Sequence, residues 1–286
     1  MRVGRIAGIW RYAVKSMGGE RLDSCELGEA GLPGDRGWAV RDEIAGEIRN
    51  GRKFPGLLLC SARYAKEPSG AEVPPAEILL PDGSSLRSDD SAISAELSRL
   101  LGRPVTLWPR RPADDLDHHR RGKPDHADIV EELREVMDRA EGEPLPDFSR
   151  YPSKFMQFAC PPGTYFDSFP VHLVTSASLR WLEELQPGTD ADPRRFRPNL
   201  LVETEGDAAG AVELEWCGRD ARVGAAELRI EMPTVRCAIP ARPQRDLPAD
   251  PDLLRTIVRH MDQDLGVYAS VRRAGRIAVG DTVELA

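Results

Sequence analysis

Short apolar or alternating runs dominate the first hundred residues, and turns rich in Gly, Pro and Asp separate them. Hydrophobic side chains at every second position are typical of strands, so this part predicts a barrel-like or sandwich sheet. The clearest runs are residues 6–14, 37–40 and 78–80. A helix is predicted over residues 93–101, capped by Asp89 or Asp90 and ended by Gly102, before a strand resumes at 105–108.

A polar segment separates the two halves of the chain. Residues 109–128 are rich in Arg, Asp, His and Pro and have no apolar period, which predicts a linker or solvated loop. A helix should follow and end before Gly142. Its apolar face is predicted to carry Ile129, Leu133, Val136, Met137 and Ala140. We expect residues 109–150 to form this linker and helix between an N-terminal β domain, residues 1–108, and a second domain, residues 151–286.

Strands and helices then alternate to the end of the chain. Strands are predicted at 171–174, 199–204, 226–232, 266–272 and 276–285, and helices at 176–185 and after the capping pair Asp250-Pro251. The fold class is therefore α+β, β-rich and dominated by antiparallel sheet.

Charge and cysteine content narrow the function classes. The formal net charge of −8 argues against a nucleic-acid partner or an anionic membrane, which require a basic surface. No apolar run approaches the roughly 20 residues that span a bilayer, and the start lacks a secretion signal, so we expect a cytoplasmic protein. The cysteines are odd in number and lack a C-x-x-C pair, which disfavours a disulfide framework or structural zinc. They are Cys25, Cys60, Cys160, Cys217 and Cys237.

Cys237 is the sharpest candidate for chemistry. It follows Arg236 at the end of a strand pattern and precedes a Pro-rich loop. An adjacent guanidinium favours thiolate, the form that ligates soft metals or attacks electrophiles. A lone Cys is more often a small buried hydrophobe, and on local evidence that reading is favoured.

Two polar clusters in the first forty residues have the composition of anion sites. Lys15 and Ser16 precede a pair of glycines, and an ammonium group, a hydroxyl group and exposed backbone N–H groups can together hold a phosphate. On local grounds an ordinary strand end is the favoured interpretation. Arg36 lies among three glycines that allow close backbone approach to a ligand or simply form a tight turn.

Two more clusters lie further along. Thr175 and Ser176 begin a helix, and Arg197 and Asn199 precede a strand, so together they form an anion site or serve as caps and surface charge. The last cluster could chelate a metal, but a solvated loop is favoured because a Pro-containing linker seldom holds ligands rigidly. It comprises Asp117, His118, His119, Asp125 and His126.

In chain order these clusters resemble the MOSC family, the domain named for the C-terminal part of molybdenum cofactor sulfurase. The N-terminal motifs are similar to the β-barrel domain that precedes MOSC in the mitochondrial amidoxime-reducing component and its bacterial relatives. They are Tyr12-Ala-Val-Lys-Ser16, Gly34-Asp-Arg-Gly-Trp38 and Pro55-Gly-Leu-Leu58. The motifs that resemble MOSC itself are Phe196-Arg-Pro-Asn199, Arg236-Cys237, Leu265-Gly-Val-Tyr268 and Gly275-Arg-Ile-Ala-Val-Gly-Asp281.

This resemblance implies an antiparallel β-barrel MOSC domain packed against an N-terminal β-barrel-like domain, with a few helices. It also implies that Cys237 ligates the molybdenum of a molybdenum cofactor (molybdopterin) and that Tyr268 lies beside the metal. The residues implied to hold the cofactor are Lys15, Ser16, Arg36, Thr175, Ser176, Arg197, Asn199 and Arg236. Where the amidoxime-reducing proteins have Ser before Arg-Cys, this chain has Val235, which removes one hydrogen bond.

The implied function is reduction of N-hydroxylated or other N-oxygenated small molecules at the metal. The chain has neither a Cys-rich ferredoxin-like extension nor a pyridoxal-phosphate domain, so we expect an external electron donor of ferredoxin, flavodoxin or cytochrome type. Two alternatives stay open: a sulfur carrier or sulfurtransferase with a persulfide on Cys237, and a cofactor-binding protein without turnover.

Overall fold

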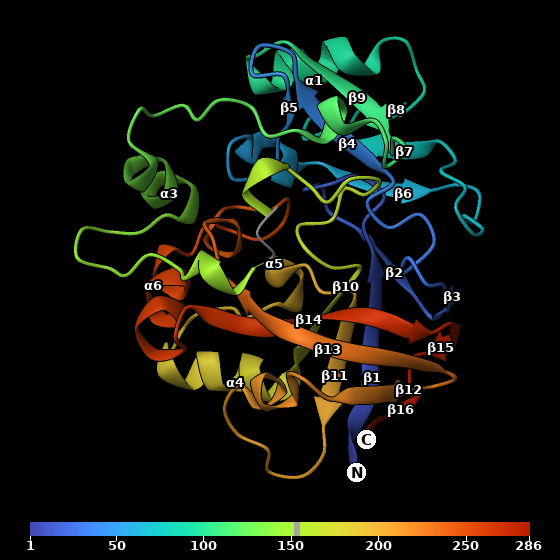
Figure 1. Ribbon diagram of the computed structural model, residues 1–286, viewed down its shortest axis with the longest axis vertical. Coiled ribbons are helices and arrows are strands. Elements are labelled where there is room, and N and C mark those ends of the chain that lie inside the picture. The colour runs from blue at the N-terminus through green and yellow to red at the C-terminus, as the bar shows by residue number, and fades with distance from the viewer. Residues whose placement is uncertain (152–154) are drawn as a thin grey trace.

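A closed barrel of seven strands organises the computed structural model, which describes residues 1–151 and 155–286 (Figure 1). The strand order around the barrel is β11-β10-β14-β13-β12-β16-β1, and β1 pairs back to β11. Neighbours are antiparallel except for β10 and β11, which pair in parallel. The strands are β1 (Arg2–Arg11), β10 (Val171–Thr175), β11 (Leu200–Thr204), β12 (Asp220–Val223), β13 (Ala226–Val235), β14 (Asp264–Arg273) and β16 (Thr282–Leu285). The expected β-rich α+β class is confirmed.

Strand β1 joins the two ends of the chain. It lies between β11 and β16, so a strand from the first eleven residues closes a barrel otherwise built from residues beyond 170. Two short strands extend the contact, because β2 (Glu20–Leu22) pairs with β1 and β3 (Ser24–Leu27) pairs with β15 (Gly275–Ala278). The barrel thus draws on both sides of residue 108, and the predicted division there stays a prediction.

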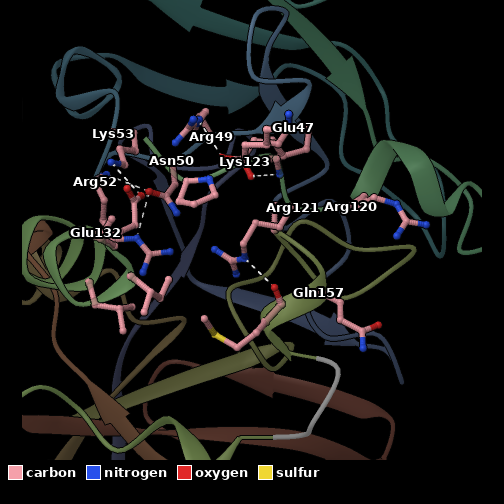
Figure 2. Close-up of a pocket in the computed structure, with 18 of the residues that line it drawn as sticks. Glu47, Arg49, Asn50, Arg52, Lys53, Arg120, Arg121, Lys123, Glu132 and Gln157 are labelled. Carbon is pink, nitrogen blue, oxygen red and sulfur yellow. Dashed lines mark hydrogen bonds and ion pairs between the residues drawn. The ribbon is translucent and has the colours of Figure 1, made fainter. Parts of the chain in front are cut away.

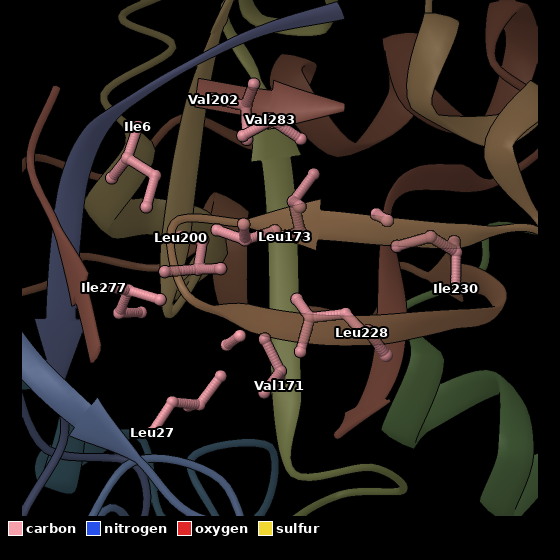
Figure 3. Close-up of a cluster of buried hydrophobic side chains, with 14 of the residues drawn as sticks. Ile6, Leu27, Val171, Leu173, Leu200, Val202, Leu228, Ile230, Ile277 and Val283 are labelled. Atoms are coloured by element: carbon pink, nitrogen blue, oxygen red, sulfur yellow. The ribbon is translucent and has the colours of Figure 1, made fainter. Parts of the chain in front are cut away.

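The barrel core follows from the period-two pattern of its strands. Along β13, Ala226, Leu228 and Ile230 are fully buried, whereas the charged residues between them are only partly buried. Figure 3 shows Leu228 and Ile230 gathered with Leu173, Leu200 and other aliphatic side chains in one cluster. Burying each large aliphatic side chain contributes about 1.5–3 kcal/mol, so this cluster fixes the barrel geometry.

Two three-stranded sheets form a second apolar core. One has the order β5-β4-β9 and the other β6-β7-β8, and α1 packs beside β9. Val40, Leu57, Ile78 and Leu97 meet in this core. The elements are β4 (Trp38–Asp42), β5 (Glu47–Ile48), η1 (Pro55–Leu59), β6 (Ser61–Tyr64), β7 (Ala76–Leu79), β8 (Ser85–Arg87), α1 (Ile93–Leu101) and β9 (Val105–Pro109).

The helices of the second half match their predicted positions. Asp250 caps α6 (Pro251–His260) by accepting a hydrogen bond from the Leu253 N–H at 3.1 Å. The predicted strand over 276–285 is divided into β15 and β16, because Gly280 turns the chain with a φ of 94°. The remaining elements are α4 (Ser176–Leu185), α5 (Pro193–Phe196), η4 (Val212–Trp216) and η5 (Ile239–Ala241). In the part of the chain that the structure describes, no helix combines the length and apolarity needed to cross a membrane.

The linker is more ordered than predicted. His118 and His119, at the end of α2 (Leu116–His119), are buried at 8% and 0% exposure, so the prediction of a solvated loop is wrong for this pair. His118 Nε2 lies 2.7 Å from the Tyr165 hydroxyl, and His119 Nε2 accepts a hydrogen bond from the Gly163 N–H at 3.1 Å. The following helix is shorter than predicted and leaves Ala140 exposed. These elements are α3 (Ile129–Met137), η2 (Phe148–Arg150) and η3 (Phe155–Gln157).

Candidate functional site

A small cavity beside Cys237 brings together most of the predicted site residues. We call it the Cys237 hollow; its volume is about 70 Å³. Cys237 lies there because β13 ends at Val235 and the chain turns away from the sheet into η5. The hollow is lined by Arg36, Asp167, Phe169, His172, residues 195–197, Asn199, residues 234–237, Ile239, Pro240 and Tyr268.

Arg236 holds the segment that carries Cys237. Its Nε donates to the Leu265 carbonyl at 2.8 Å, its Nη1 to the Phe196 carbonyl at 3.2 Å, and its Nη2 lies 2.7 Å from His172 Nε2. Because Nη2 is a donor, this contact assigns the His172 proton to Nδ1. Burial and then the charge of Arg236 lower the pKa of His172 well below its ordinary value, so the ring is neutral. Arg236 therefore positions the segment while its charge stays beside Cys237.

Arg197 and Thr234 each offer a buried polar atom without a partner. Arg197 adopts a left-handed backbone with a φ of 56°, and its Nη1 donates to the Met17 carbonyl at 2.6 Å. Its guanidinium carbon lies 4.3 Å from the centre of the Tyr12 ring. Among the described residues, Arg197 Nη2 and Thr234 Oγ1 find no hydrogen-bond partner. Such an atom costs about 1–3 kcal/mol, which a bound acceptor would offset.

Arg36 and Asn199 form the wall toward the N-terminal residues. Arg36 has a left-handed φ of 48° and pairs with the buried carboxylate of Asp35. Its Nη1 also lies 3.4 Å from Asn199 Oδ1. The Asn199 amide joins two strands, because it donates to the Trp10 carbonyl at 3.2 Å and accepts from the His172 N–H at 3.1 Å. Asn199 thus holds the strands on this side of the hollow together, and Arg36 supplies a positive charge there.

Lys15 reaches the site through an ion pair. Its Nζ lies 2.7 Å from Asp167 Oδ1 and 2.8 Å from the Tyr165 carbonyl. Burial acts to raise the pKa of Asp167, but Lys15, Arg52 and other cations outweigh it and hold that pKa well below its usual range. The carboxylate of Asp167 therefore lies where a ligand anion would be attracted.

Ser16 lies next to Lys15 but does not line the hollow. Its backbone is left-handed, with a φ of 72°, and its Oγ accepts a hydrogen bond from the Gly51 N–H at 2.8 Å. This bond fixes the turn that presents Lys15.

Thr175 and Ser176 lie apart from the hollow, at the far end of β10. Thr175 Oγ1 donates to the buried carboxylate of Glu213 at 2.7 Å, and Ser176 Oγ accepts from the Thr204 N–H at 3.1 Å. Ser178 Oγ and the Gly266 N–H also donate to Glu213. Cofactor binding by Thr175 and Ser176 stays a prediction, since their hydroxyl groups are engaged elsewhere.

Tyr268 forms an aromatic wall of the hollow. Its ring centre lies 5.6 Å from that of His172 and 5.9 Å from that of Phe169. Burial raises the pKa of the Tyr268 phenol, so the hydroxyl keeps its proton at neutral pH and is available as a hydrogen-bond donor.

Sequence reasoning missed three polar residues that line the hollow: Asp167, His172 and Thr234. Thr234 lies three positions before Cys237 and is buried, whereas Val235 beside it is only partly buried. The strand alternation around Arg236-Cys237 is the signal that could have identified Thr234. His172 and Asp167 gave no comparable signal, because their partners are distant in the chain.

The alternative that residues of the linker chelate a metal is not supported, because these residues do not lie together as one group. His118 and His119 pack on Tyr165, while His126 lies close to Glu132 and Glu135. The Lys53 ammonium lies 3.0 Å from Glu132 and 3.2 Å from Glu135 and already supplies a cation there. These acids are therefore matched without a metal.

Comparisons with known proteins cover both halves of the chain. Residues 3–86 match the model of the MOSC N-terminal beta barrel domain, and residues 162–284 match that of the MOSC domain. No protein with curated function matches the chain. A solved structure of the YUAD protein from Bacillus subtilis is similar at 14% identity and a TM-score of 0.45, covering 99% of this chain and 95% of its own.

Two further solved structures align with part of the chain. YiiM from Geobacillus stearothermophilus is 20% identical, with a TM-score of 0.33, and YiiM from Escherichia coli is 16% identical, with a TM-score of 0.32. Each match covers 41% of this chain and 54% of the other.

Proposed function

Because this chain belongs to the MOSC family and carries the MOSC N-terminal β-barrel domain before its MOSC domain, we propose that it binds a molybdenum cofactor in the Cys237 hollow. With that cofactor it reduces N-hydroxylated or other N-oxygenated small molecules, using electrons from a partner protein. The observation that supports this proposal is the pair of unpartnered donors, Arg197 Nη2 and Thr234 Oγ1, in the hollow that contains Cys237.

The residues around Cys237 fit the chemistry of this cofactor. Four arginines line the hollow, and the described lining has a single carboxylate residue, Asp167. The cofactor has an anionic phosphate, which guanidinium groups bind by charge-assisted hydrogen bonds, and a soft metal, which a thiolate ligates. The unpartnered donors would each gain an acceptor.

The proposal assigns separate roles to these residues. Cys237 would ligate the metal, and Lys15, Arg36, Arg197 and Thr234 would hold anionic oxygen atoms. Ser16, Asn199 and Arg236 would position these groups through hydrogen bonds to the backbone. A cofactor contact by Thr175 and Ser176 stays a prediction.

When bound, the cofactor would supply two-electron reduction at a metal, so that an N–OH group takes up two electrons and two protons and gives N–H and water. The chain orients the substrate and manages hydrogen bonds. Tyr268 presents a protonated hydroxyl to the substrate oxygen, and the neutral His172 ring keeps Arg236 in place beside Cys237. In this proposal the electrons come from a partner protein.

The test is the metal content of protein made in a host that synthesises the cofactor. Stoichiometric molybdenum in the wild type, lost in Cys237→Ser and kept in Cys217→Ser, is the expected result. Cys217 is a matched control because it is also partly buried but lies outside the hollow. Unchanged molybdenum in Cys237→Ser would sink the ligand assignment.

Activity is tested separately. Loaded protein with a chemical reductant should convert benzamidoxime to benzamidine, and failure to do so would contradict the reductase proposal. A mass gain of one sulfur on Cys237, without metal, would instead support the sulfur carrier.

A further inference from the structure

A larger cavity, of about 460 Å³, lies between the N-terminal sheets and the linker (Figure 2). We call it the linker cavity. Its lining comes from residues 47–50, Arg52, Lys53, residues 120–124, Ile129, Glu132, Leu133, Val136, Met137, Phe148, Met156, Gln157 and Ala159. One wall is apolar, formed by Leu133, Val136 and Met137 of α3 with Phe148 and Met156. The volume falls within the range of roughly 300–1,000 Å³ that is typical of small-molecule sites.

The rest of this lining is strongly basic. Six cationic side chains contribute to it: Arg49, Arg52, Lys53, Arg120, Arg121 and Lys123. The described lining has two carboxylates, Glu47 and Glu132, and both are engaged. Glu47 accepts from the Gly122 N–H at 2.6 Å and pairs with Arg49 at 2.9 Å. Glu132 accepts from the Asp125 N–H at 2.9 Å and pairs with Lys53 at 3.0 Å. Arg49, Lys53 and Arg120 also pair with carboxylates outside the lining, whereas Arg52 and Arg121 form no ion pair among the described residues.

Arg52 and Arg121 carry this unmatched charge. The Arg121 guanidinium donates to the carbonyls of Met156 at 3.1 Å and Phe158 at 2.9 Å, which are neutral acceptors. Arg52 Nε donates to Asn50 Oδ1 at 3.2 Å, and in the described chain its Nη atoms meet no acceptor. Burial and then repulsion from Arg52 lower the pKa of Arg121, although the charge of Glu47 acts in the opposite direction. An anion placed between them would relieve this repulsion.

A third hollow, of about 490 Å³, borders both the linker cavity and the Cys237 hollow. It shares Arg120 and Gln157 with the linker cavity, and Asp167 and Phe169 with the Cys237 hollow. Most of its exposed lining is apolar, and it includes Pro161. A molecule can therefore extend from the basic residues toward Cys237 along a largely apolar path.

We propose that the linker cavity binds the carboxylate or phosphate of an organic substrate whose apolar body runs along this path and places its other end in the Cys237 hollow. The anion lies between Arg52 and Arg121, and the α3 wall and the connecting hollow contact the body. This inference rests on the proposed function for the identity of the ligand as a substrate. The preference for an amphiphilic anion comes from the cavity itself.

Binding of a non-reducible probe tests the cavity without any turnover. Isothermal titration calorimetry of the full-length protein with 4-phenylbutyrate should give saturable binding, and the neutral 4-phenylbutanamide should bind at least about tenfold more weakly. Arg121→Gln should weaken 4-phenylbutyrate binding by about tenfold or more, whereas Arg121→Lys, which keeps the charge, should retain most of it. Arg99→Gln on exposed α1 is the surface control. Thermal melting identifies variants that fail to fold.

The same titration on cofactor-loaded protein distinguishes a substrate anion from the phosphate of the cofactor as the natural occupant of the linker cavity. Undiminished binding supports a substrate site, and loss of binding on loading means that the cofactor phosphate fills the cavity, which would overturn the proposal. Absence of saturable binding in the wild type, or equal binding in Arg121→Gln, would overturn it as well.

Steady-state kinetics then test whether a substrate bound in the linker cavity reaches Cys237. The kcat/KM for 4-carboxybenzamidoxime should fall about tenfold in Arg121→Gln, while that for the neutral benzamidoxime should stay within twofold of the wild type. An equal loss for both substrates would contradict the inference. If neither compound is reduced by the wild type, the reductase proposal fails, and the calorimetry alone decides whether the cavity binds anions.

Discussion

Replacing Arg197 with methionine tests whether its guanidinium binds a ligand or stabilises the fold. The substitution leaves the buried Met17 carbonyl without its donor, at a cost of about 1–3 kcal/mol, and removes the contact with the Tyr12 ring, worth about 0.5–2 kcal/mol. It also removes the unpartnered Nη2 atom, whose burial costs about 1–3 kcal/mol. Burial lowers the pKa of Arg197 to about 10, so the group is buried as a cation and its removal relieves that cost as well.

These contributions nearly cancel in the cofactor-free protein. We therefore expect the free energy of unfolding of Arg197→Met to lie within about 1 kcal/mol of the wild type. Methionine adopts the left-handed backbone at this position no less readily than arginine. In the loaded protein a charged hydrogen bond worth about 1.5–3 kcal/mol is lost, which weakens cofactor binding about 10-fold to 150-fold.

Arg195 is the matched control. It is a buried arginine that lines the same hollow, but its guanidinium donates to the carbonyls of Asp190 and Pro248, both at 2.9 Å. Arg195→Met leaves these buried carbonyls without donors and should lower the free energy of unfolding by about 2–5 kcal/mol. Its effect on cofactor affinity should be small wherever the variant folds.

Urea unfolding of the cofactor-free proteins and the molybdenum content of the loaded proteins measure the two effects. A stability loss above about 3 kcal/mol in Arg197→Met, with molybdenum content unchanged, would refute the reasoning, because Arg197 would then be a structural residue. If Arg197→Met lost no more molybdenum than Arg195→Met, the proposed role of Arg197 in cofactor binding would also be contradicted.

Two buried titratable groups give opposite dependences of stability on pH. Burial raises the pKa of Glu213 above its ordinary 4.5, despite hydrogen bonds from Ser178 and Thr175. The folded state then keeps a proton that the unfolded chain has lost, so the free energy of unfolding falls as pH rises from 4.5 to the raised pKa. Urea unfolding across this range should show a flatter dependence for Glu213→Gln, and parallel curves would contradict the assignment. Burial, followed by the charge of His119, lowers the pKa of His118 from 6.5 to about 4, so stability should fall as pH drops through that interval. His118→Gln should be less sensitive to acid over the same interval, and an unchanged slope would argue against a neutral buried His118.

Local patterns predicted the elements that depend on local rules. Helix α4 begins at Ser176 and ends at Leu185 as its apolar period and the following Pro-Gly pair indicate, and Asp250 caps α6 as expected. One continuous strand was predicted over 276–285, but the structure has two, because Gly280 adopts a turn conformation between them. The sequence pattern did not reveal this turn. Apolar period alone does not distinguish a continuous strand from two short ones.

Residues whose partners are far away in the chain were harder to predict. His118 lies in a polar segment that gives no local reason for burial, and it is buried because Tyr165, 47 residues later, meets its ring. Lys15 was predicted as an anion ligand, but its ion pair with Asp167 spans 152 residues. The strand alternation could have identified Thr234 as buried, but only the folded structure shows that its hydroxyl has no hydrogen-bond partner among the described residues.

Strand β1 also governs the order in which the chain can fold. It is synthesised before its barrel partners β11 and β16, so Gly4 can pair only after Thr204 and Val283 have been made. Pairings of such long sequence separation are slow to form, and until β16 is made both β1 and β12 present an open strand edge. The barrel therefore closes only when β16 pairs with both β1 and β12. A ribosome that stalls before residue 282 would release a chain with two unpaired edges, prone to pair with another copy of itself.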